Sequence, residues 1–263
     1  MSTSEVLPSV ADFISISTLS KRYPHSKPVI EDFSLRVAAG EFVSLLGASG
    51  CGKSTLLAMI AGLTGTSAGS IHIDGRPPAH ARELMSFVFQ DPALLPWRTV
   101  AGNVSLSLEF AGRSKSTRAA RIAEVLELVG LQDVAGYYPR ELSGGMKMRA
   151  SLARALASTP RLMLMDEPFG ALDEMTRNRL NEELLALKAR QRWTTVFVTH
   201  SISEAVFLSD RILLMGGNPA ERLREIRVSL PMPRTAALRS TPLFLSLVGE
   251  VSMALAMMAG MPT

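Results

Sequence analysis

Two adjacent carboxylates follow an apolar run in the second half of the chain. Residues 162–165 read LMLM, the composition of a strand in a dry core, and Asp166 and Glu167 come directly after them. Burying one unpaired charge is costly, and burying two side by side costs more. The pattern therefore requires a cation at the end of this strand, unless the strand is not buried. A helix N-cap at Asp166 suits the residue type, but it leaves Glu167 and the apolar run unexplained.

A glycine-rich segment can supply the partner of such a cation. Residues 47–54 read GASGCGKS and match the pattern G-x-x-x-x-G-K-[ST], between a predicted strand at 42–47 and a predicted helix at 54–61. The glycines let backbone N–H groups converge on phosphate oxygens, and the helix N-terminus attracts the same anion. A chance glycine-rich turn is the alternative, but it does not require this strand–loop–helix context. The predicted nucleotide-binding residues of the loop are Gly47, Ala48, Ser49, Gly50, Cys51, Gly52, Lys53, Ser54 and Thr55.

The two motifs explain each other. We expect Lys53 to reach the β- and γ-phosphates of a nucleotide and Ser54 to join a Mg²⁺ ion. A P-loop NTPase has a second strand, which we expect next to the strand that leads into the phosphate loop, and its terminal Asp holds the same ion. Asp166 then faces a cation, and Glu167 is free to polarise a water molecule against the γ-phosphate.

The bulk composition fits a globular protein of the cytoplasm. The chain has 263 residues, of which 47% are hydrophobic and 20% charged, enough for an α/β domain with an inserted subdomain. Its net charge of +4 is too diffuse to indicate a nucleic acid partner. Cys51 is the only cysteine, so an internal disulfide is impossible and a reducing compartment is expected. The first 13 residues lack the basic and apolar regions of a signal peptide.

Strand and helix patterns divide the chain into an α/β core and a helical block. Strands are predicted at 13–18, 33–37, 42–47, 70–75 and 86–90, and again at 162–165, 194–199, 211–215 and 224–230. Residues 99–156 show helical patterns without a convincing strand, and another helix is predicted at 174–188. Such alternation indicates an α/β fold with a mostly parallel sheet, some antiparallel strands, and ligands at the carboxyl ends of the strands. The predicted parts are a catalytic core at 11–90 and 160–230, a helical subdomain at 91–159 and a C-terminal tail at 231–263.

Further motifs occur in a fixed order along the chain. Residues 142–146 read LSGGM before a predicted helix at 146–157, Gln90 lies in FVFQDP, residues 171–173 read ALD, and His200 follows TTVFVT. Together with the phosphate loop, this series resembles the ATP-binding cassette (ABC) transporter ATPases from about residue 13 to residue 215. The resemblance implies a P-loop NTPase core with an inserted helical subdomain, and ATP and Mg²⁺ as ligands.

The resemblance also implies roles for single residues. Tyr23 lies where the family has an aromatic residue that stacks on adenine, and Gln90 matches the glutamine that touches Mg²⁺ and the attacking water. His200 matches the switch histidine, a donor to the γ-phosphate and to the water held by Glu167. From the pattern alone, His200 could equally be a structural hydrogen-bonding residue and Gln90 a loop cap. The predicted catalytic residues are Glu167, His200, Gln90 and Lys53, and the predicted metal ligands are Ser54, Gln90 and Asp166.

The LSGGM segment predicts a second anion site. Free N–H groups at the start of the following helix and a serine hydroxyl can bind phosphate. In the family, this site covers the γ-phosphate held by the partner's Lys53, so two copies enclose ATP in an isologous interface. The signature residues that would act in trans are Leu142, Ser143, Gly144, Gly145 and Met146, and the D-loop residue is Asp173. Met146 replaces the usual glutamine of the signature. Met148 stands where many relatives carry a glutamine.

The similarity is greatest to the importer branch for nitrate, sulfonates and taurine, through residues 87–104, LSGGM and residues 199–212. It implies the ATP-hydrolysing subunit of an importer, bound peripherally to the cytoplasmic side of the inner membrane. The implied partners are a second ATPase subunit, identical or related, ABC permease subunits and, indirectly, a solute-binding protein. The alternatives are the ATPase of an exporter, often fused to membrane domains, and a non-transport ABC ATPase, which usually has a coiled coil or two cassettes.

Two apolar segments fall outside these motifs. One is a cluster that either packs under the helical block or receives a helix of the permease; its residues are Pro92, Leu94, Leu95, Pro96 and Trp97. The other covers residues 243–260 and contains Glu250 as its only charge. A spanning helix needs about 20 apolar residues and usually basic flanks, so we expect an amphipathic terminal helix or an interaction tail instead.

Overall fold

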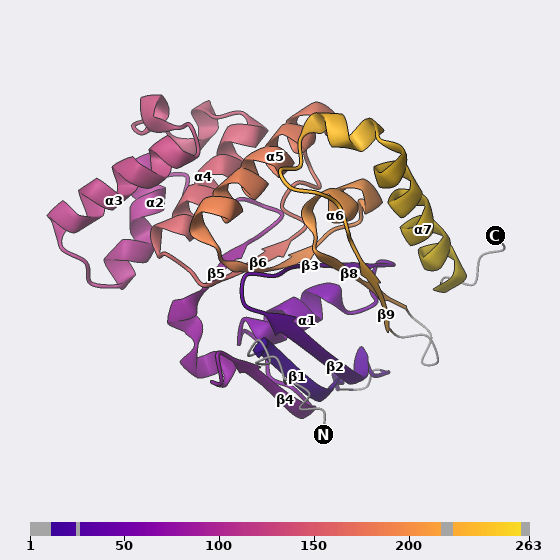
Figure 1. The fold of residues 1–263 in the computed structure, drawn as a ribbon. Helices are drawn as coiled ribbons and strands as arrows, with labels where there is room; N and C mark the ends of the chain where they lie inside the picture. Colours follow the sequence, from indigo (N-terminus) through magenta and orange to yellow (C-terminus); the bar gives the residue numbers. More distant parts are fainter. Residues whose placement is uncertain (1–11, 25–26, 217–222, 259–263) are drawn as a thin grey trace, which may run out of the picture.

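The structure is a computed structural model that describes residues 12–24, 27–216 and 223–258 (Figure 1). Its main sheet has the strand order β5-β6-β7-β3-β8-β9. The first five strands in this order, β5, β6, β7, β3 and β8, run parallel, and β9 pairs antiparallel with β8. The strands are β3 (Phe42–Gly47), β5 (Met85–Val88), β6 (Leu162–Asp166), β7 (Thr194–Val198), β8 (Arg211–Met215) and β9 (Leu223–Arg227). The predicted α/β class with a mostly parallel sheet is confirmed.

The predicted neighbour of the phosphate-loop strand is wrong. β7 lies between β3 and β6, because Val198 of β7 pairs with Leu45 on one side and with Asp166 on the other. All of β7 is buried, and periodicity cannot show which of several fully buried strands occupies the centre of a sheet. Since strands are about 4.8 Å apart, β7 separates the two chemical motifs by roughly 10 Å of backbone, which side chains must bridge.

A second, antiparallel sheet has the strand order β2-β1-β4. It consists of β1 (Asp12–Lys21), β2 (Ile30–Ala38) and β4 (Ala68–Ile73). Helix α1 (Lys53–Ile60) lies between this sheet and the main sheet (Figure 1). One apolar cluster contains buried residues of all three layers, including Ile14, Leu56, Leu57 and Val196. The helix that follows the phosphate loop is therefore anchored on both sides.

The helical block contains α2 (Val100–Phe110), α3 (Lys115–Leu128) and α4 (Gly144–Ala157). It forms a separate lobe at one side of the molecule (Figure 1). Each helix begins at a hydroxyl cap: the side chains of Thr99, Ser114 and Ser143 accept from backbone N–H groups of their first turns. The described residues between 99 and 156 contain no strand, as predicted.

The remaining helices follow the strands of the main sheet. They are α5 (Glu174–Gln191), α6 (Ile202–Leu208) and α7 (Pro242–Met258). The 3₁₀ turns are Pro78–His80, Arg82–Leu84, Gln132–Val134, Pro139–Glu141 and Ala236–Ser240. Helix α7 buries Phe244, Val251 and Ala254, whereas Leu245 and Met253 on its other side are each 57% exposed. This confirms an amphipathic terminal helix over 242–258; residues 259–260 of the predicted segment lie outside the described residues. Over the part of the chain that the structure describes, no helix is long and apolar enough to span a membrane.

Candidate active site

The phosphate loop connects β3 to α1 at the carboxyl edge of the main sheet. Gly47 ends β3 with no room for a side chain, because a Cβ there would collide with the Met215 carbonyl oxygen. Gly52 precedes α1 at φ 102°, a left-handed conformation that favours glycine, and a Cβ would lie 3.0 Å from Ile30 Cγ1. The sequence between strand and helix thus folds into a tight loop whose N–H groups are not screened by side chains.

Lys53 lies inside this loop. Its side chain is buried, and Nζ donates to the carbonyl oxygens of Gly47 at 2.8 Å and Ala48 at 2.9 Å. Nζ also lies 3.8 Å from Cys51 Sγ. An ammonium group that is held by neutral carbonyls can exchange these partners for phosphate oxygens, which bind it more strongly because they are charged.

Ser54 and Asp166 bridge the gap that β7 creates. Ser54 Oγ donates to Asp166 Oδ1 at 3.1 Å. Burial raises the pKa of the Asp166 carboxyl, and the negative charge of Glu167 adds to this shift, while the Ser54 hydroxyl and the Lys53 charge oppose it. A hydroxyl and a carboxylate in contact are the hard oxygen donors that Mg²⁺ prefers, and substrate phosphates usually complete its coordination. The residues present therefore fit a magnesium ion.

Glu167 and His200 meet at the ends of β6 and β7. His200 Nε2 lies 2.5 Å from Glu167 Oε1, and the Glu167 N–H donates to the Val198 carbonyl oxygen at 2.9 Å. Glu167 has φ 47°, a conformation that non-glycine residues seldom adopt and that occurs disproportionately at functional sites. The His200 side chain is 49% exposed and that of Glu167 is 22% exposed, so the pair faces solvent at the edge of the sheet.

Gln90 lies close to this pair. It follows β5 and is exposed, and its Nε2 would be 3.4 Å from a Cβ on Gly170. The Gly170 N–H donates to the Glu167 carbonyl oxygen at 3.1 Å, closing the turn after the carboxylates. The structure thus brings together Lys53, Ser54, Asp166, Glu167, His200 and Gln90, which lie on four different strand ends.

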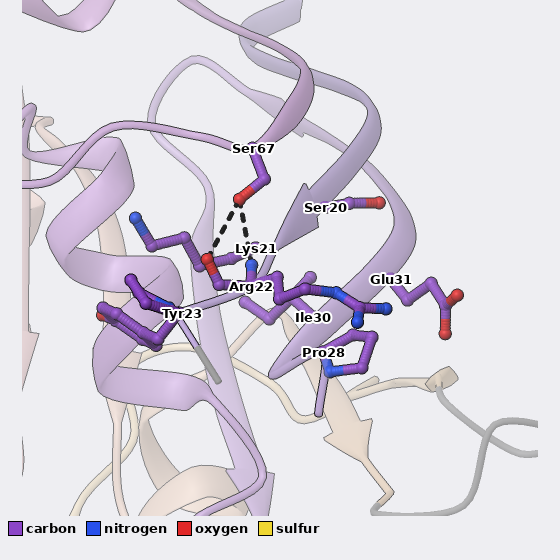
Figure 2. A pocket seen from close by; sticks show the side chains of 9 residues that line it. Ser20, Lys21, Arg22, Tyr23, Pro28, Ile30, Glu31 and Ser67 are labelled. Atoms are coloured by element: carbon purple, nitrogen blue, oxygen red, sulfur yellow. Dashed lines mark hydrogen bonds between the residues drawn. The ribbon is translucent and has the colours of Figure 1, made fainter. Parts of the chain in front are cut away.

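Tyr23 lines a cavity of about 450 Å³ (Figure 2). Ile30, which also lines it, is the residue that packs against Gly52. Lys21 Nζ lies 4.8 Å from the centroid of the Tyr23 ring. Ser67 fixes the backbone of Arg22, between Lys21 and Tyr23. Its Oγ accepts from the Arg22 N–H at 3.0 Å and donates to the Arg22 carbonyl oxygen at 3.3 Å. An aromatic ring within a cavity next to the loop suits a flat heterocycle.

The signature segment faces the D-loop. Ser143 caps α4 by accepting from the Met146 N–H at 3.3 Å, while Leu142 is buried. A Cβ on Gly144 would lie 3.3 Å from Leu172 Cδ2, and one on Gly145 would lie 3.0 Å from Thr176 Cγ2. A cavity of about 320 Å³ at this contact is lined by Ser143, Gly144, Gly145 and Asp173, and by no residue of the phosphate loop.

The apolar cluster after Gln90 is divided between the core and the surface. Leu94 is half-buried against the main core, as one alternative predicts. Trp97 is 71% exposed, so the prediction that this residue packs under its own helices is wrong. Arg154 of α4 donates to the carbonyl oxygens of Ala93 at 2.7 Å and Pro92 at 2.8 Å. The loop that follows Gln90 is thereby fixed to the helix that begins with the signature.

Residues 30–170, more than half of the chain, match the family model described as ABC transporter. The chain belongs to the ABC transporter family. It is 44% identical over 226 residues to the nitrate import ATP-binding protein of Synechococcus elongatus, spanning 84% of this chain and 34% of that protein. It is 46% identical over 198 residues to the taurine import ATP-binding protein of Rhizobium johnstonii, which covers 75% of this chain and 76% of the relative.

Solved structures also resemble this ABC subunit. One is an ATP-binding cassette described as a dimer in a post-hydrolysis state with bound ADP and Pi. It has a TM-score of 0.73 and 32% sequence identity, and the match covers 83% of this chain and all of that one.

Sequence reasoning missed a buried carboxylate four residues after His200 of this ABC subunit. Glu204, in the first turn of α6, is only 4% exposed and accepts from Thr199 Oγ1 at 2.5 Å. The spacing Ser201-x-x-Glu204 is the signal of a capping box and gave a hint of the helix, but not of burial. Only the packing of α5 and the C-terminal segment against α6 encloses this side chain.

Proposed function

We propose that this ABC subunit energises the uptake of a small solute by hydrolysing ATP at the site formed by the phosphate loop, β6 and β7. The observation that carries the proposal is the 2.5 Å contact of His200 Nε2 with Glu167 Oε1, next to the Ser54–Asp166 pair. A general base, a donor and a set of oxygen ligands then converge on the place where a γ-phosphate extends from the loop.

Each residue has a part in the proposed reaction. Lys53 exchanges its loop carbonyls for β- and γ-phosphate oxygens, and the ring of Tyr23 stacks on the adenine. Ser54, Asp166 and Gln90 would hold Mg²⁺, which would neutralise charge on the phosphates. Glu167 removes a proton from the water that attacks the γ-phosphorus, the bond from this phosphorus to the bridging oxygen breaks, and ADP and inorganic phosphate leave. His200 donates a hydrogen bond to the phosphate oxygens. The contact between His200 Nε2 and Glu167 Oε1 places the two groups side by side before ATP binds; the Nε2–H must leave the carboxylate to donate to a phosphate oxygen, which also frees Glu167 to act as the base.

We infer that the complete site forms between two copies of the chain. The signature residues line a cavity with the D-loop instead of the phosphate loop, so their free N–H groups need a phosphate from elsewhere. A solved relative with 32% identity is described as a dimer with ADP and Pi. In the proposed dimer, Ser143 and its glycines contact the γ-phosphate bound to the partner's Lys53.

The proposed partner at the membrane is a pair of ABC permease subunits on the cytoplasmic side. The exposed Trp97, in the loop that Arg154 of the signature helix holds at Pro92 and Ala93, supports a docking surface there. The named imports of the similar proteins, nitrate and taurine, support a small anion or related molecule as the transported solute. A solute-binding protein would act on the permease and not on this chain.

Replacing Glu167 by Gln tests the mechanism. We expect ATP binding to persist and phosphate release to fall by about 10²–10⁴-fold, the usual cost of losing a general base. Purified protein would be assayed for phosphate release and for nucleotide binding. Glu83→Gln is the matched control, since its surface pair with Arg76 should contribute little. Near-normal turnover of Glu167→Gln would remove Glu167 from the reaction.

A further inference from the structure

Glu204 is a buried charged group that the proposed reaction does not use. Its Oε2 accepts from Thr199 Oγ1, and its Oε1 has no hydrogen-bond partner among the described residues. Burial raises the pKa of this carboxyl, and the Thr199 hydroxyl and the charge of Arg177 oppose the shift. Helix α6 does not need this carboxylate as a cap, because Ser201 Oγ accepts the Glu204 N–H at 3.3 Å. A buried carboxylate is costly, so its retention calls for a reason outside helix capping.

Glu204 is connected to the switch histidine through one hydroxyl group. Thr199 directly precedes His200, and while its Oγ1 donates to Glu204 it also accepts the Ser201 N–H at 3.0 Å. The Thr199 N–H donates to the Leu45 carbonyl oxygen at 3.3 Å, which ties the same residue to β3. The backbone on both sides of His200 is therefore fixed by Thr199, whose hydroxyl is oriented by Glu204.

Two cations act on Glu204 besides the Thr199 hydroxyl. The charges of Arg177, in the first turn of α5, and of Arg239 both oppose the rise in its pKa, as does the side chain of the buried Asn181. Arg177 Nη2 also donates to the Leu172 carbonyl oxygen at 2.8 Å. These groups offset part of the cost of the buried carboxylate, but the contact that leads from it towards the site is the one with Thr199.

We propose that Glu204 is a positioning residue: it orients the Thr199 hydroxyl, and Thr199 in turn places His200 beside Glu167. The inference rests on the proposed function of the site. Without the carboxylate, the Thr199 hydroxyl loses the acceptor of its hydrogen bond, and the backbone on either side of His200 is held less firmly.

Thr199→Val tests the first connection, because valine keeps the shape of threonine and removes the hydroxyl. We expect kcat for ATP hydrolysis to fall by about 10- to 100-fold, the typical effect of losing a partner that orients a site residue, with KM for ATP unchanged. Thr199→Ser, which keeps the hydroxyl, should restore most of the rate. Thr195→Val is the matched control: Thr195 lies in β7, which ends just before Thr199, and is fully buried, and its hydroxyl has no hydrogen-bond partner among the described residues, so its kcat should be unchanged.

A double-mutant cycle separates positioning from general damage. In a His200→Ala background, Thr199→Val should lower kcat no further, because its effect acts through His200. A further loss of similar size in that background, or an unchanged kcat in the single variant, would overturn the first connection. If Glu167→Gln retains turnover, the proposed function fails as well; if it abolishes turnover while Thr199→Val does not lower it, only this inference fails.

Glu204→Gln and Glu204→Leu test the second connection, from Glu204 to Thr199. The amide oxygen of Gln can still accept from Thr199, so we expect its kcat to stay close to that of wild type, whereas Leu removes the acceptor and should lower kcat as Thr199→Val does. Thermal melting and nucleotide binding would establish that both variants are folded. A kcat of Glu204→Leu equal to that of wild type would overturn the role of Glu204.

Discussion

The charge of Asp166, which we propose holds a metal ion, lowers the stability of the folded chain. Burial raises its pKa, and the adjacent Glu167 charge raises it further. A carboxyl whose pKa is raised by folding destabilises the folded state above its unfolded pKa, and the cost disappears as the pH falls below that value. The hydrogen bond from Ser54 and the nearby Lys53 compensate only in part, so a bound cation should relieve the remainder.

Asp166→Asn should therefore raise the melting temperature of the protein without ligands at pH 8. A gain of 1 kcal/mol in the free energy of unfolding corresponds to roughly 2–4 °C in the melting temperature of a chain of this size. The difference in melting temperature from wild type should decrease towards roughly pH 4, where an ordinary Asp titrates. The same variant should lose most of the stabilisation by MgATP. The measurement is thermal melting as a function of pH, with the exposed Asp133→Asn as control. If the difference in melting temperature between Asp166→Asn and wild type stays constant with pH, the buried charge of Asp166 is not its cause.

At the scale of elements, predictability follows from how local the chemistry is. The phosphate loop and LSGGM could be read from contiguous residues, because their N–H groups and helix starts lie within one turn of each motif. The position of β7 between β3 and β6 could not, since every residue of all three strands but Asp166 is buried and buried strands look alike in sequence. The role of Glu204 was also hidden, because α5, α6 and the C-terminal segment enclose it only after folding.

The start of α4 gives a test of assembly at the same scale. Ser143→Arg should abolish cooperative hydrolysis while leaving ATP affinity nearly intact, because the defect acts in the partner's site. Mixing this variant with Lys53→Ala should recover part of the activity, since a mixed dimer contains one composite site with an intact lysine and an intact serine. Ser114→Arg is the control, as it removes an equivalent cap from α3, at a typical cost of about 1 kcal/mol. No recovered phosphate release in the mixture would count against the two-chain site.

At the scale of the whole molecule, the site and the apolar surface are mechanically connected. Arg154 of α4 holds the loop after Gln90 by two carbonyl oxygens, and burial lowers the pKa of its guanidinium. Gln90, beside the turn between Glu167 and Gly170, lies at one end of that loop, and Trp97 lies at the other. In the proposed dimer, a displacement of the signature helix would move the start of this loop with it, and the exposed tryptophan at its other end would transmit the movement to the proposed membrane partner.

Trp97→Ser should separate hydrolysis from transport. Trp97 is 71% exposed, so the melting temperature and basal ATPase activity should change little, while co-purification with the permease and solute uptake should fall by at least tenfold, the effect of losing a hot-spot contact of about 1.4 kcal/mol or more. Phe110→Ser is the matched control, because Phe110 is 83% exposed at the far end of α2, about 15 Å of helix away. Equal loss of permease binding in both variants would indicate a general surface effect. Normal binding of the Trp97 variant would place the permease elsewhere on the molecule, and a collapse of its melting temperature would mean that Trp97 stabilises the fold despite its exposure.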